Sequence, residues 1–365
     1  MNIGAKIKEK TSKLYQYIRL RQLFSKDCEF SRVHPELMKL WEKKFRQMIR
    51  YSSDRTFPIA EEFVTVKFEK CTKREVEAVN ENIPILICAV KNDVEKMHYF
   101  MEHYRDLGIE EFVFVDNMST DGTFEFLMEQ PDTIVYRCEH PFTADRKIAW
   151  INRLIAEMGI DKWYLMVDSD EFFTFLGVDN GKNFKDVVEY AEKIGVKRLG
   201  VMHLDLYPKG TLFEKKDQLS FAEKYCYFDK DTYAYGKTKR GMAIFGGPRS
   251  RVFGTKVKIS GYRMIFFEKD DIVPSAHYMI PYEKSYNVPL CLISKHYKFV
   301  NESDYEKIIE AVETGMHSDN SAEYKTYLKG IMQNQEVSFY SEEHSLLFTE
   351  DNLKKIDIID NLFED

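Results

Sequence analysis

Three acids stand within four positions at the end of an apolar run, in the segment WYLMVDSDEFFTF (163–175). Asp168 and Asp170 are one residue apart, so in an extended chain both carboxylates point to the same side. Two hard oxygens on one side suit Mg²⁺ or Mn²⁺. A turn with exposed acids is the simpler alternative, but the place of this pair at the end of an apolar strand favours a metal site.

Two other polar clusters follow apolar runs in the same way. KND (91–93) follows IPILICAV (83–90), and DNMSTDGT (116–123) follows EEFVFV (110–115). In parallel α/β sheets, ligands bind beyond the carboxyl ends of the strands, so three such ends make a site. Asp116 and Asn117 could hydrogen-bond the edge of a flat base, whereas Ser119 and Asp121 fit a turn and a helix cap.

Four cationic residues are candidates for contacts with an anionic ligand. Arg146 and Lys147 open the helix expected before the D-x-D strand, so either could reach a phosphate or a ribose. Arg249 and Arg251 follow paired glycines, and the planar guanidinium group suits phosphate or carboxylate. Ordinary ion pairing or helix-face charge is the alternative for each of them.

The elements that must position these residues alternate at short spacing. Apolar runs at 83–90, 110–115, 133–138 and 162–173 read as strands, and 93–108, 124–131 and 145–159 have helical spacing. This order predicts βαβ units in an α/β fold with a mostly parallel sheet and helices on both faces. From 303 onward the chain reads as helices, and no internal repeat occurs.

Net charge, cysteine content and the composition of the N-terminal segment limit the kinds of protein that this chain can be. The chain has 365 residues and a formal charge of −7, which argues against general nucleic-acid binding. Six cysteines without a close pair fit a reducing compartment, and we expect a cytoplasmic protein. The N-terminal segment is basic, with apolar residues at helical spacing, and could lie against the inner face of the plasma membrane. A helix packed on its own domain is the alternative.

The three strand-end motifs together resemble a known protein family. AVKND (89–93), VDNMSTDGT (115–123) and WYLMVDSDEFF (163–173) resemble glycosyltransferase family 2, in particular a bacterial subfamily whose strand-end motif reads D-x-D-E-F. GGPRSRVF (246–253) and ISKHYKF (293–299) resemble its later segments, so the resemblance covers about residues 83–300. It implies a GT-A fold and a transfer of sugar from a nucleotide-diphosphate donor, UDP-sugar by preference, with Mn²⁺ or Mg²⁺.

The implied acceptor is a glycan or a lipid-linked acceptor in bacterial surface polysaccharide synthesis. The implied domains are a basic helical extension (1–80), a catalytic domain (81–300) and a helical C-terminal region (301–365). The catalytic domain would divide into a nucleotide-binding half (83–175) and an acceptor half (176–300).

The resemblance also implies roles for single residues. Asp168 and Asp170 match the metal ligands, and Asp116 and Asn117 match the base-contacting acids, although the family commonly has aspartate where this chain has Asn117. The remaining expected contacts to the nucleotide sugar, besides the four cations above, are Ala89, Val90, Asn92 and Ser169.

Histidines and carboxylates complete the expected site. Enzymes of the GT-A fold often bring a histidine back to the metal, so His277 and His296 are candidates, with a satisfied buried histidine as the alternative. An inverting transfer needs a carboxylate that takes the proton of the acceptor hydroxyl. Asp205 is the preferred candidate, Glu171 is the second, and Asp229 also stays open.

Two other functions are alternatives to the glycosyltransferase that the motifs suggest. A sugar nucleotidyltransferase needs a glycine-rich loop after its first strand, and AVKNDVEKM (89–97) contains no glycine. A non-catalytic nucleotide- or sugar-binding module is disfavoured because an idle site has no reason to hold two acids so close together.

Overall fold

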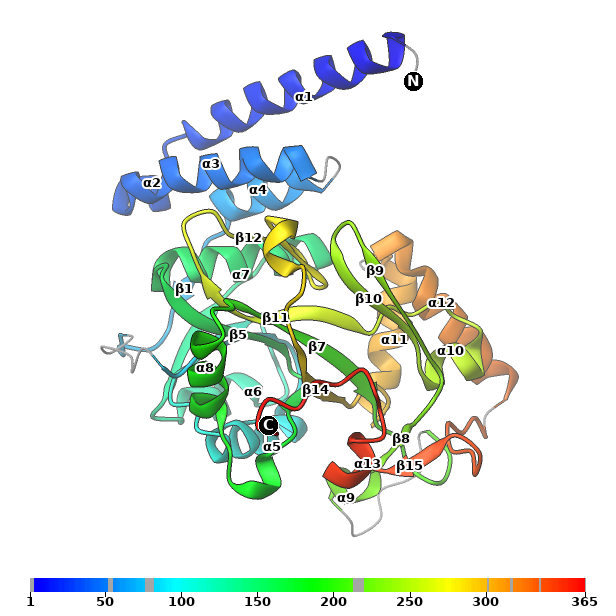
Figure 1. Cartoon of the computed structure of the whole chain (residues 1–365). Coiled ribbons are helices and arrows are strands. Elements are labelled where there is room, and N and C mark those ends of the chain that lie inside the picture. The colour runs from blue at the N-terminus through cyan, green and yellow to red at the C-terminus, as the bar shows by residue number, and fades with distance from the viewer. Residues whose placement is uncertain are drawn as a thin grey trace.

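Residues 3–51, 55–75, 82–212, 220–300, 302–315, 318–334 and 336–364 are described by the computed structural model of the chain. One large sheet crosses the molecule, with helices on both of its sides (Figure 1). Its nine strands, in their order across the sheet, are β1 (Glu69–Lys70), β4 (Thr133–Arg137), β3 (Phe112–Asp116), β2 (Ile85–Val90), β5 (Lys162–Asp168), β11 (Ser260–Phe267), β7 (Arg198–Asp205), β14 (Leu290–His296) and β6 (Glu171–Thr174).

The sheet is mixed but mostly parallel. Strands β2, β3, β4 and β5 pair in parallel, and so do β7 and β14. Strand β11 runs antiparallel to its neighbours β5 and β7, and the edge strands β1 and β6 are also antiparallel. These pairings set β2, β3, β4, β5, β7 and β14 in one direction, and the predicted α/β class with a mostly parallel sheet is confirmed.

Helices and short strands complete the fold. The helices are α1 (Ile3–Phe24), α2 (Glu29–Val33), α3 (Pro35–Tyr51), α4 (Thr56–Thr65), α5 (Val94–Asp106), α6 (Thr123–Met128), α7 (Ala144–Met158), α8 (Phe184–Lys193), α9 (Phe221–Lys224), α10 (Pro248–Phe253), α11 (Glu302–Thr314), α12 (Ser318–Gln333) and α13 (Glu350–Leu353). Three two-stranded sheets are formed by β8 (Tyr227–Asp229) with β15 (Ser345–Leu347), β9 (Tyr233–Thr238) with β10 (Gly241–Gly246), and β12 (Ile272–Ser275) with β13 (Tyr278–Ile280).

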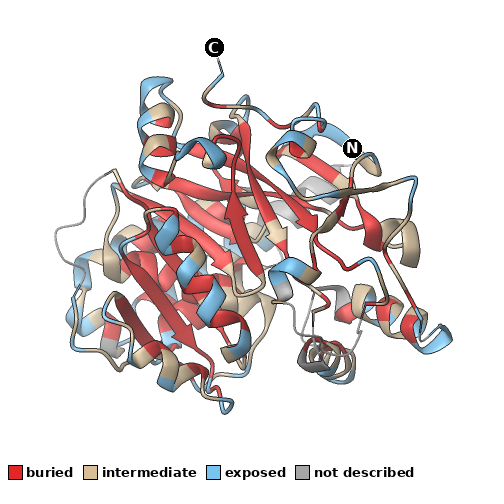
Figure 2. Ribbon diagram, turned by 90° about the horizontal axis from the view of Figure 1, so that it is seen from below, coloured by how far each residue is buried: buried red, intermediate tan, exposed pale blue. Residues whose placement is uncertain are grey.

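The parallel strands are apolar on both faces because both faces are covered. In β2, Leu86 and Cys88 pack in a core with α5, α6 and α8. Ile85 and Ile87, which alternate with them, pack in a second core with α3, α4 and α7. Figure 2 shows the resulting pattern, with buried strands at the centre and helices exposed on their outer sides.

The N- and C-terminal regions pack against this frame. Helices α3 and α4 bury Trp41, Phe45 and Phe63 in the second core, and α1 lies on their outer side (Figure 1). At the other end of the chain, α11 and α12 form a third core around Tyr327 and Phe339. Among the described residues, no helix is both long and apolar enough to cross a membrane.

The segment 162–173 differs from its predicted single strand. Ser169 and Asp170 form a turn that separates β5 from β6, and β6 pairs with β14 at the far edge of the sheet. Two residues span roughly 10 Å at most, so the sheet must curl until its edge lies beside the end of β5. The backbone N–H of Tyr297 donates to the carbonyl of Asp170 (2.8 Å), which fixes the turn to the end of β14.

Candidate functional site

A cavity of about 410 Å³ opens at the carboxyl ends of β2, β3 and β5. The start of α7 and the turn between β12 and β13 form one wall, and α11 and α12 form another. Nine of the predicted site residues line it, namely Ala89, Val90, Asn92, Asn117, Lys147, Asp168, Ser169, Asp170 and His277. The three strand ends singled out in the sequence therefore do converge on one cavity.

Asp168 ends β5 and is held by cations. Lys147 Nζ donates to its Oδ2 (2.7 Å), and Nη2 of Arg263 lies 3.7 Å from the same oxygen. Burial by itself would raise the pKa of Asp168, but Lys147 and Arg263 outweigh it and the pKa is lowered. Asp168 is therefore an ionised carboxylate facing the cavity.

Asp170 is also ionised, through a different set of partners. Its Oδ2 lies 3.5 Å from Nε2 of His296 and 3.8 Å from Nζ of Lys298. Burial, the largest single effect, would raise the pKa of Asp170, but His296, Lys298 and Lys96 together outweigh it and the pKa falls well below its usual value. His296 does not line the cavity but lies behind this acid.

The second ring nitrogen of His296, Nδ1, contacts the buried carboxylate of Asp205. Nδ1 of His296 lies 2.6 Å from Oδ1 of Asp205, and Arg249 Nε donates to the other Asp205 oxygen (2.7 Å). Burial would lower the pKa of His296, but Asp170 and Asp205 raise it to about 9. His296 thus has one nitrogen aimed at Asp170 and one anchored to a buried carboxylate.

His277 lies on the cavity wall between β12 and β13. Its Nδ1 is 3.0 Å from the carbonyl of Ser260, so this nitrogen is the donor and Nε2 is left as the acceptor. Burial lowers the pKa of His277 to about 3, so the ring is neutral. Among the described residues, His296 contacts Asp170, whereas His277 only lines the same cavity as the two acids.

The expected base-contacting residues have clear structural partners. Asp116 is fully buried, accepts the N–H of Ser119 (3.1 Å) and does not line the cavity. The Asn117 amide donates to the carbonyls of Cys138 and His140, at 2.8 Å each. An aspartate has no hydrogen to give to these carbonyls, so the amide of Asn117 is suited to this position.

Asn92 joins two of the strand ends. Its backbone N–H donates to Ser119 Oγ (3.0 Å), and its side-chain Oδ1 accepts the N–H of Thr120 (2.8 Å). The φ of 53° at Asn92 is left-handed, a conformation that asparagine tolerates better than most residues. This turn places Ala89 and Val90 at the cavity surface.

Three of the predicted cationic contacts lie outside the cavity. Arg146 donates to Glu62 Oε2 (3.2 Å), and Arg251 forms a bidentate pair with Asp229 (2.9 and 2.8 Å). Arg249 is buried between Asp205 and Glu323. Their contacts are structural, and a role in donor binding stays a prediction for them.

Both predicted catalytic carboxylates are buried beneath the site and do not line the cavity. Asp205 is 2% exposed and lies between Arg249 and His296. Burial by itself would raise the pKa of Asp205, but these two partners together outweigh it and the pKa is lowered. Glu171 is 4% exposed, accepts the N–H of Asp168 (3.1 Å) and lies 3.3 Å from Arg263 Nη2. Burial raises the pKa of Glu171 in spite of Arg263.

Sequence reasoning missed several charged side chains of the cavity wall. Lys298 donates to Tyr324 Oη (2.8 Å), and Lys307 donates to Asp93 Oδ1 (2.5 Å). Lys298 lies inside the segment ISKHYKF, so its motif offered a signal. Lys307 and Glu323 lie on α11 and α12, where no motif marks them, and only the fold brings them to the cavity.

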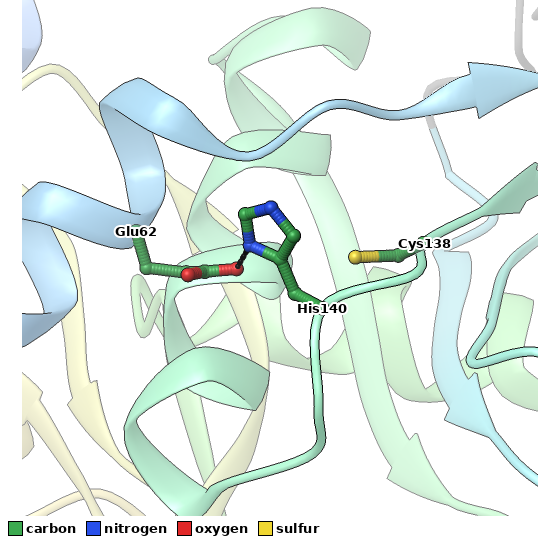
Figure 3. Close-up of side chains that lie close together, drawn as sticks. All are labelled: Glu62, Cys138 and His140. Carbon is green, nitrogen blue, oxygen red and sulfur yellow. Dashed lines mark hydrogen bonds and ion pairs between the residues drawn. The ribbon is translucent and has the colours of Figure 1, made fainter.

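Among the described residues, two groups place three possible ligand atoms close enough together to hold a metal ion, and neither contains Asp168 or Asp170. One is Glu62, Cys138 and His140, whose ligand atoms lie within 4.8 Å of one another (Figure 3). Glu62 already accepts from His140 (2.8 Å) and from Trp150 Nε1 (2.7 Å), and burial raises the pKa of Cys138 to about 11. The other group, Glu268 with Asp270 and Asp271, is neutralised by Lys284.

Comparisons with known proteins find no related sequence and only weak structural similarity. No family model matches the sequence, and no curated protein matches it. Among solved structures, the chain is similar to residues 1–349 of TarS from S. aureus, with 12% identity, coverage of 69% of this chain and 72% of that chain, and a TM-score of 0.31. It is also similar to HddC from Yersinia pseudotuberculosis, with 10% identity, coverage of 62% and 97%, and a TM-score of 0.31. At these scores the function has to be argued from the site itself.

Proposed function

We propose that this protein is a metal-dependent glycosyltransferase of the GT-A type, which moves a sugar from a nucleotide-diphosphate donor to a glycan or lipid-linked acceptor. The observation that carries the proposal is the pair Asp168 and Asp170, two ionised carboxylates that line one cavity at the end of the parallel strand β5 and in the turn after it. Such acids in a cavity lined by lysines suit a ligand that brings both a cation and phosphates. UDP is the first nucleotide to test.

The residues present fit a divalent cation. Asp168 and Asp170 offer carboxylate oxygens. His296, whose raised pKa keeps the ring protonated, would offer Nε2 once a binding cation displaces the proton on that nitrogen, while Nδ1 stays bound to Asp205. This ligand set suits Mn²⁺ or Mg²⁺. When bound, the ion would neutralise charge that develops on the departing diphosphate.

The chain itself supplies the rest of the donor site. Lys147, Lys298 and Lys307 line the same cavity and would pair with phosphate oxygens. Phe142 and Ile148 give one end of the cavity an apolar wall, which suits the flat face of a base. The carbonyl oxygen of Asn117 remains available at that cavity surface.

Glu323 is the carboxylate that we assign to the acceptor. It lines the cavity and its side chain is 41% exposed, whereas Asp205 and Glu171 are buried away from it. Its Oε1 is held by Arg249 (3.0 Å) and Tyr327, and among the described residues Oε2 has no hydrogen bond. This orientation leaves one oxygen free for a hydroxyl in the cavity.

Glu310 also lines the cavity and is 50% exposed, and its Oε1 lies 3.7 Å from Nζ of Lys91. The two remaining acids outside the pair Asp168 and Asp170 are engaged more closely. Asp93 accepts from Ser169 Oγ (2.7 Å) and Lys307, and Asp304 pairs with the buried Lys96 (2.5 Å). Glu323 would take the proton of the acceptor hydroxyl as that oxygen bonds to the anomeric carbon. The bond from the anomeric carbon to the diphosphate breaks, and its electron pair leaves with the phosphate oxygen. The configuration at the anomeric carbon is inverted.

The test is isothermal titration with UDP, GDP and CDP, each with and without Mn²⁺. The wild type and a variant that carries Asp168→Asn with Asp170→Asn are compared. We expect one nucleotide to bind only with metal, and the variant to lose that binding. Absence of metal-dependent binding of all three nucleotides would overturn the proposal.

A further inference from the structure

The outermost helix of the molecule, α1, is apolar on two opposite sides. Its inner side buries Leu20, Leu23 and Phe24 against α3 and α4. Its outer side exposes Leu14 (60%), Tyr15 (62%) and Ile18 (49%). Figure 1 shows α1 at the edge of the molecule, beyond α3 and α4 and away from the sheet.

Helical geometry places the exposed residues together. Residues advance by about 100° around a helix, so Leu14 and Ile18 are separated by about 40° and form one stripe. Leu20 follows Ile18 by about 200°, which puts it on the opposite side. The exposed residues are therefore a continuous outer stripe and not the margin of the buried side.

Positive charge is concentrated in the segment that contains α1. Residues 1–26 contain seven Lys or Arg and one acid, whereas the whole chain has 53 Lys and Arg against 60 Asp and Glu. Arg19 and Arg21 are exposed on α1 next to the stripe. A positive helix thus projects from a protein that is otherwise negative.

We propose that the outer stripe of α1, defined by Leu14, Tyr15 and Ile18, docks on an anionic membrane surface. A bilayer with anionic headgroups offers negative charge for the flanking cations and an apolar layer for the stripe. A second copy of this chain could offer its own outer stripe, but that stripe is flanked by the same cations, which would repel those of the first copy. The docking does not depend on the proposed transferase activity.

The first test is flotation of the full chain with vesicles of phosphatidylcholine alone and of phosphatidylcholine mixed with phosphatidylglycerol, at a ratio of about two to one. We expect the protein to float with the mixed vesicles only. Leu14→Ser with Ile18→Ser should reduce the bound fraction at least about tenfold, because both anchors are removed. Arg21→Glu, which leaves the stripe intact, should also weaken binding, and more so at low salt.

A matched control is Ile194→Ser, which removes an equally exposed apolar residue (43%) at the end of α8. It should float like the wild type. A second readout is the tryptophan fluorescence of a Tyr15→Trp variant. The three native tryptophans, Trp41, Trp150 and Trp163, are at most 1% exposed, so a change of solvent at the surface would alter mainly the emission of the added tryptophan. Its emission should shift to the blue with mixed vesicles only.

Three results would overturn the proposal. They are no flotation with the mixed vesicles, flotation that the stripe variant does not reduce, and vesicle-free dimers that the stripe variant abolishes. The last result would identify a second copy of the chain as the occupant. Metal-dependent nucleotide binding is measured separately, so failure here leaves the proposed function standing.

Discussion

The imidazole of His296 is anchored to Asp205 by a 2.6 Å contact between Nδ1 and Oδ1, directly behind Asp170. This contact fixes the plane of the ring and directs Nε2 toward the acid. Asp205 was the preferred catalytic base from sequence, and its burial gives it the geometry of a positioning residue instead.

We expect Asp205→Asn to weaken Mn²⁺ binding by about 10- to 100-fold, because the histidine loses the carboxylate that orients it. The measurement is Mn²⁺ titration followed by electron paramagnetic resonance. Asp229→Asn is the matched control, since Asp229 is an equally buried acid paired with an arginine away from the cavity. Equal losses in both variants would contradict the positioning role.

Glu323→Gln should lower turnover by about 10²- to 10⁴-fold while nucleotide affinity stays unchanged, since only the proton acceptor is removed. Turnover is followed as release of the nucleoside diphosphate from the donor class that the titrations identify. Glu313→Gln, on the exposed side of α11, serves as the control. A variant with normal turnover would remove Glu323 from the proposed mechanism.

Asn117→Asp should destabilise the fold by about 1–3 kcal/mol, although aspartate is common there in the resembling family. The carboxylate would face two carbonyl oxygens that now receive amide hydrogens, and the site is only 5% exposed. Urea unfolding measures the difference. Asn180→Asp, at an exposed position, should leave the stability within the error.

Lys44 gives the protein a pH-dependent stability that is independent of the cavity. Its Nζ donates to the carbonyls of Glu268 (2.9 Å) and Asp271 (2.7 Å), and burial lowers its pKa to about 7 against the effects of Asp271 and Asp270. In the unfolded chain a lysine titrates near 10.5. Between these values the unfolded state binds more protons, so stability rises with pH.

We therefore expect the wild type to gain stability relative to Lys44→Met from pH 7 to about 10, by at most about 1.4 kcal/mol per pH unit. Other groups titrate equally in both proteins, so the difference between them isolates Lys44. Urea unfolding across this range is the measurement. A difference that does not change with pH would show that the amine titrates normally in the folded state.

The parallel half of the sheet could be predicted because its signal is local. The segments that became β2, β3 and β5 are continuously apolar, as strands covered on both faces must be. The insertion of β11 between β5 and β7 could not be predicted, because strand pairing over such a sequence distance leaves no local pattern. The turn at Ser169 and Asp170 was missed because the apolar pattern continues on both of its sides.

The candidate site divides in the same way. Asp168, Asp170 and Asn92 lie at strand ends, where a rule about sheets places ligands, and all three line the cavity. Glu323 and Lys307 come from helices with ordinary amphipathic sequences, so only the tertiary packing brings them to the wall. The burial of Asp205 likewise depends on Arg249, a residue that its own motif suggested for ligand binding.

The two-residue connection between β5 and β6 links ligand occupancy to the dynamics of a distant sheet edge. Asp170 lies in that connection, and its carbonyl accepts the N–H of Tyr297 at the end of β14. A ligand that immobilises Asp170 would slow the local opening that separates β6 from β14. The reason is that β6 follows Asp170 directly in the chain, while β14 is hydrogen-bonded to Asp170 through Tyr297. The amide of Phe173 donates to the Tyr104 hydroxyl (2.9 Å), so the hydrogen-bonded pairs of the two strands are those of Phe172 and Thr174 on either side of it. The amide hydrogens of Phe172 and Thr174 would then report the filling of a cavity to which neither residue contributes a side chain.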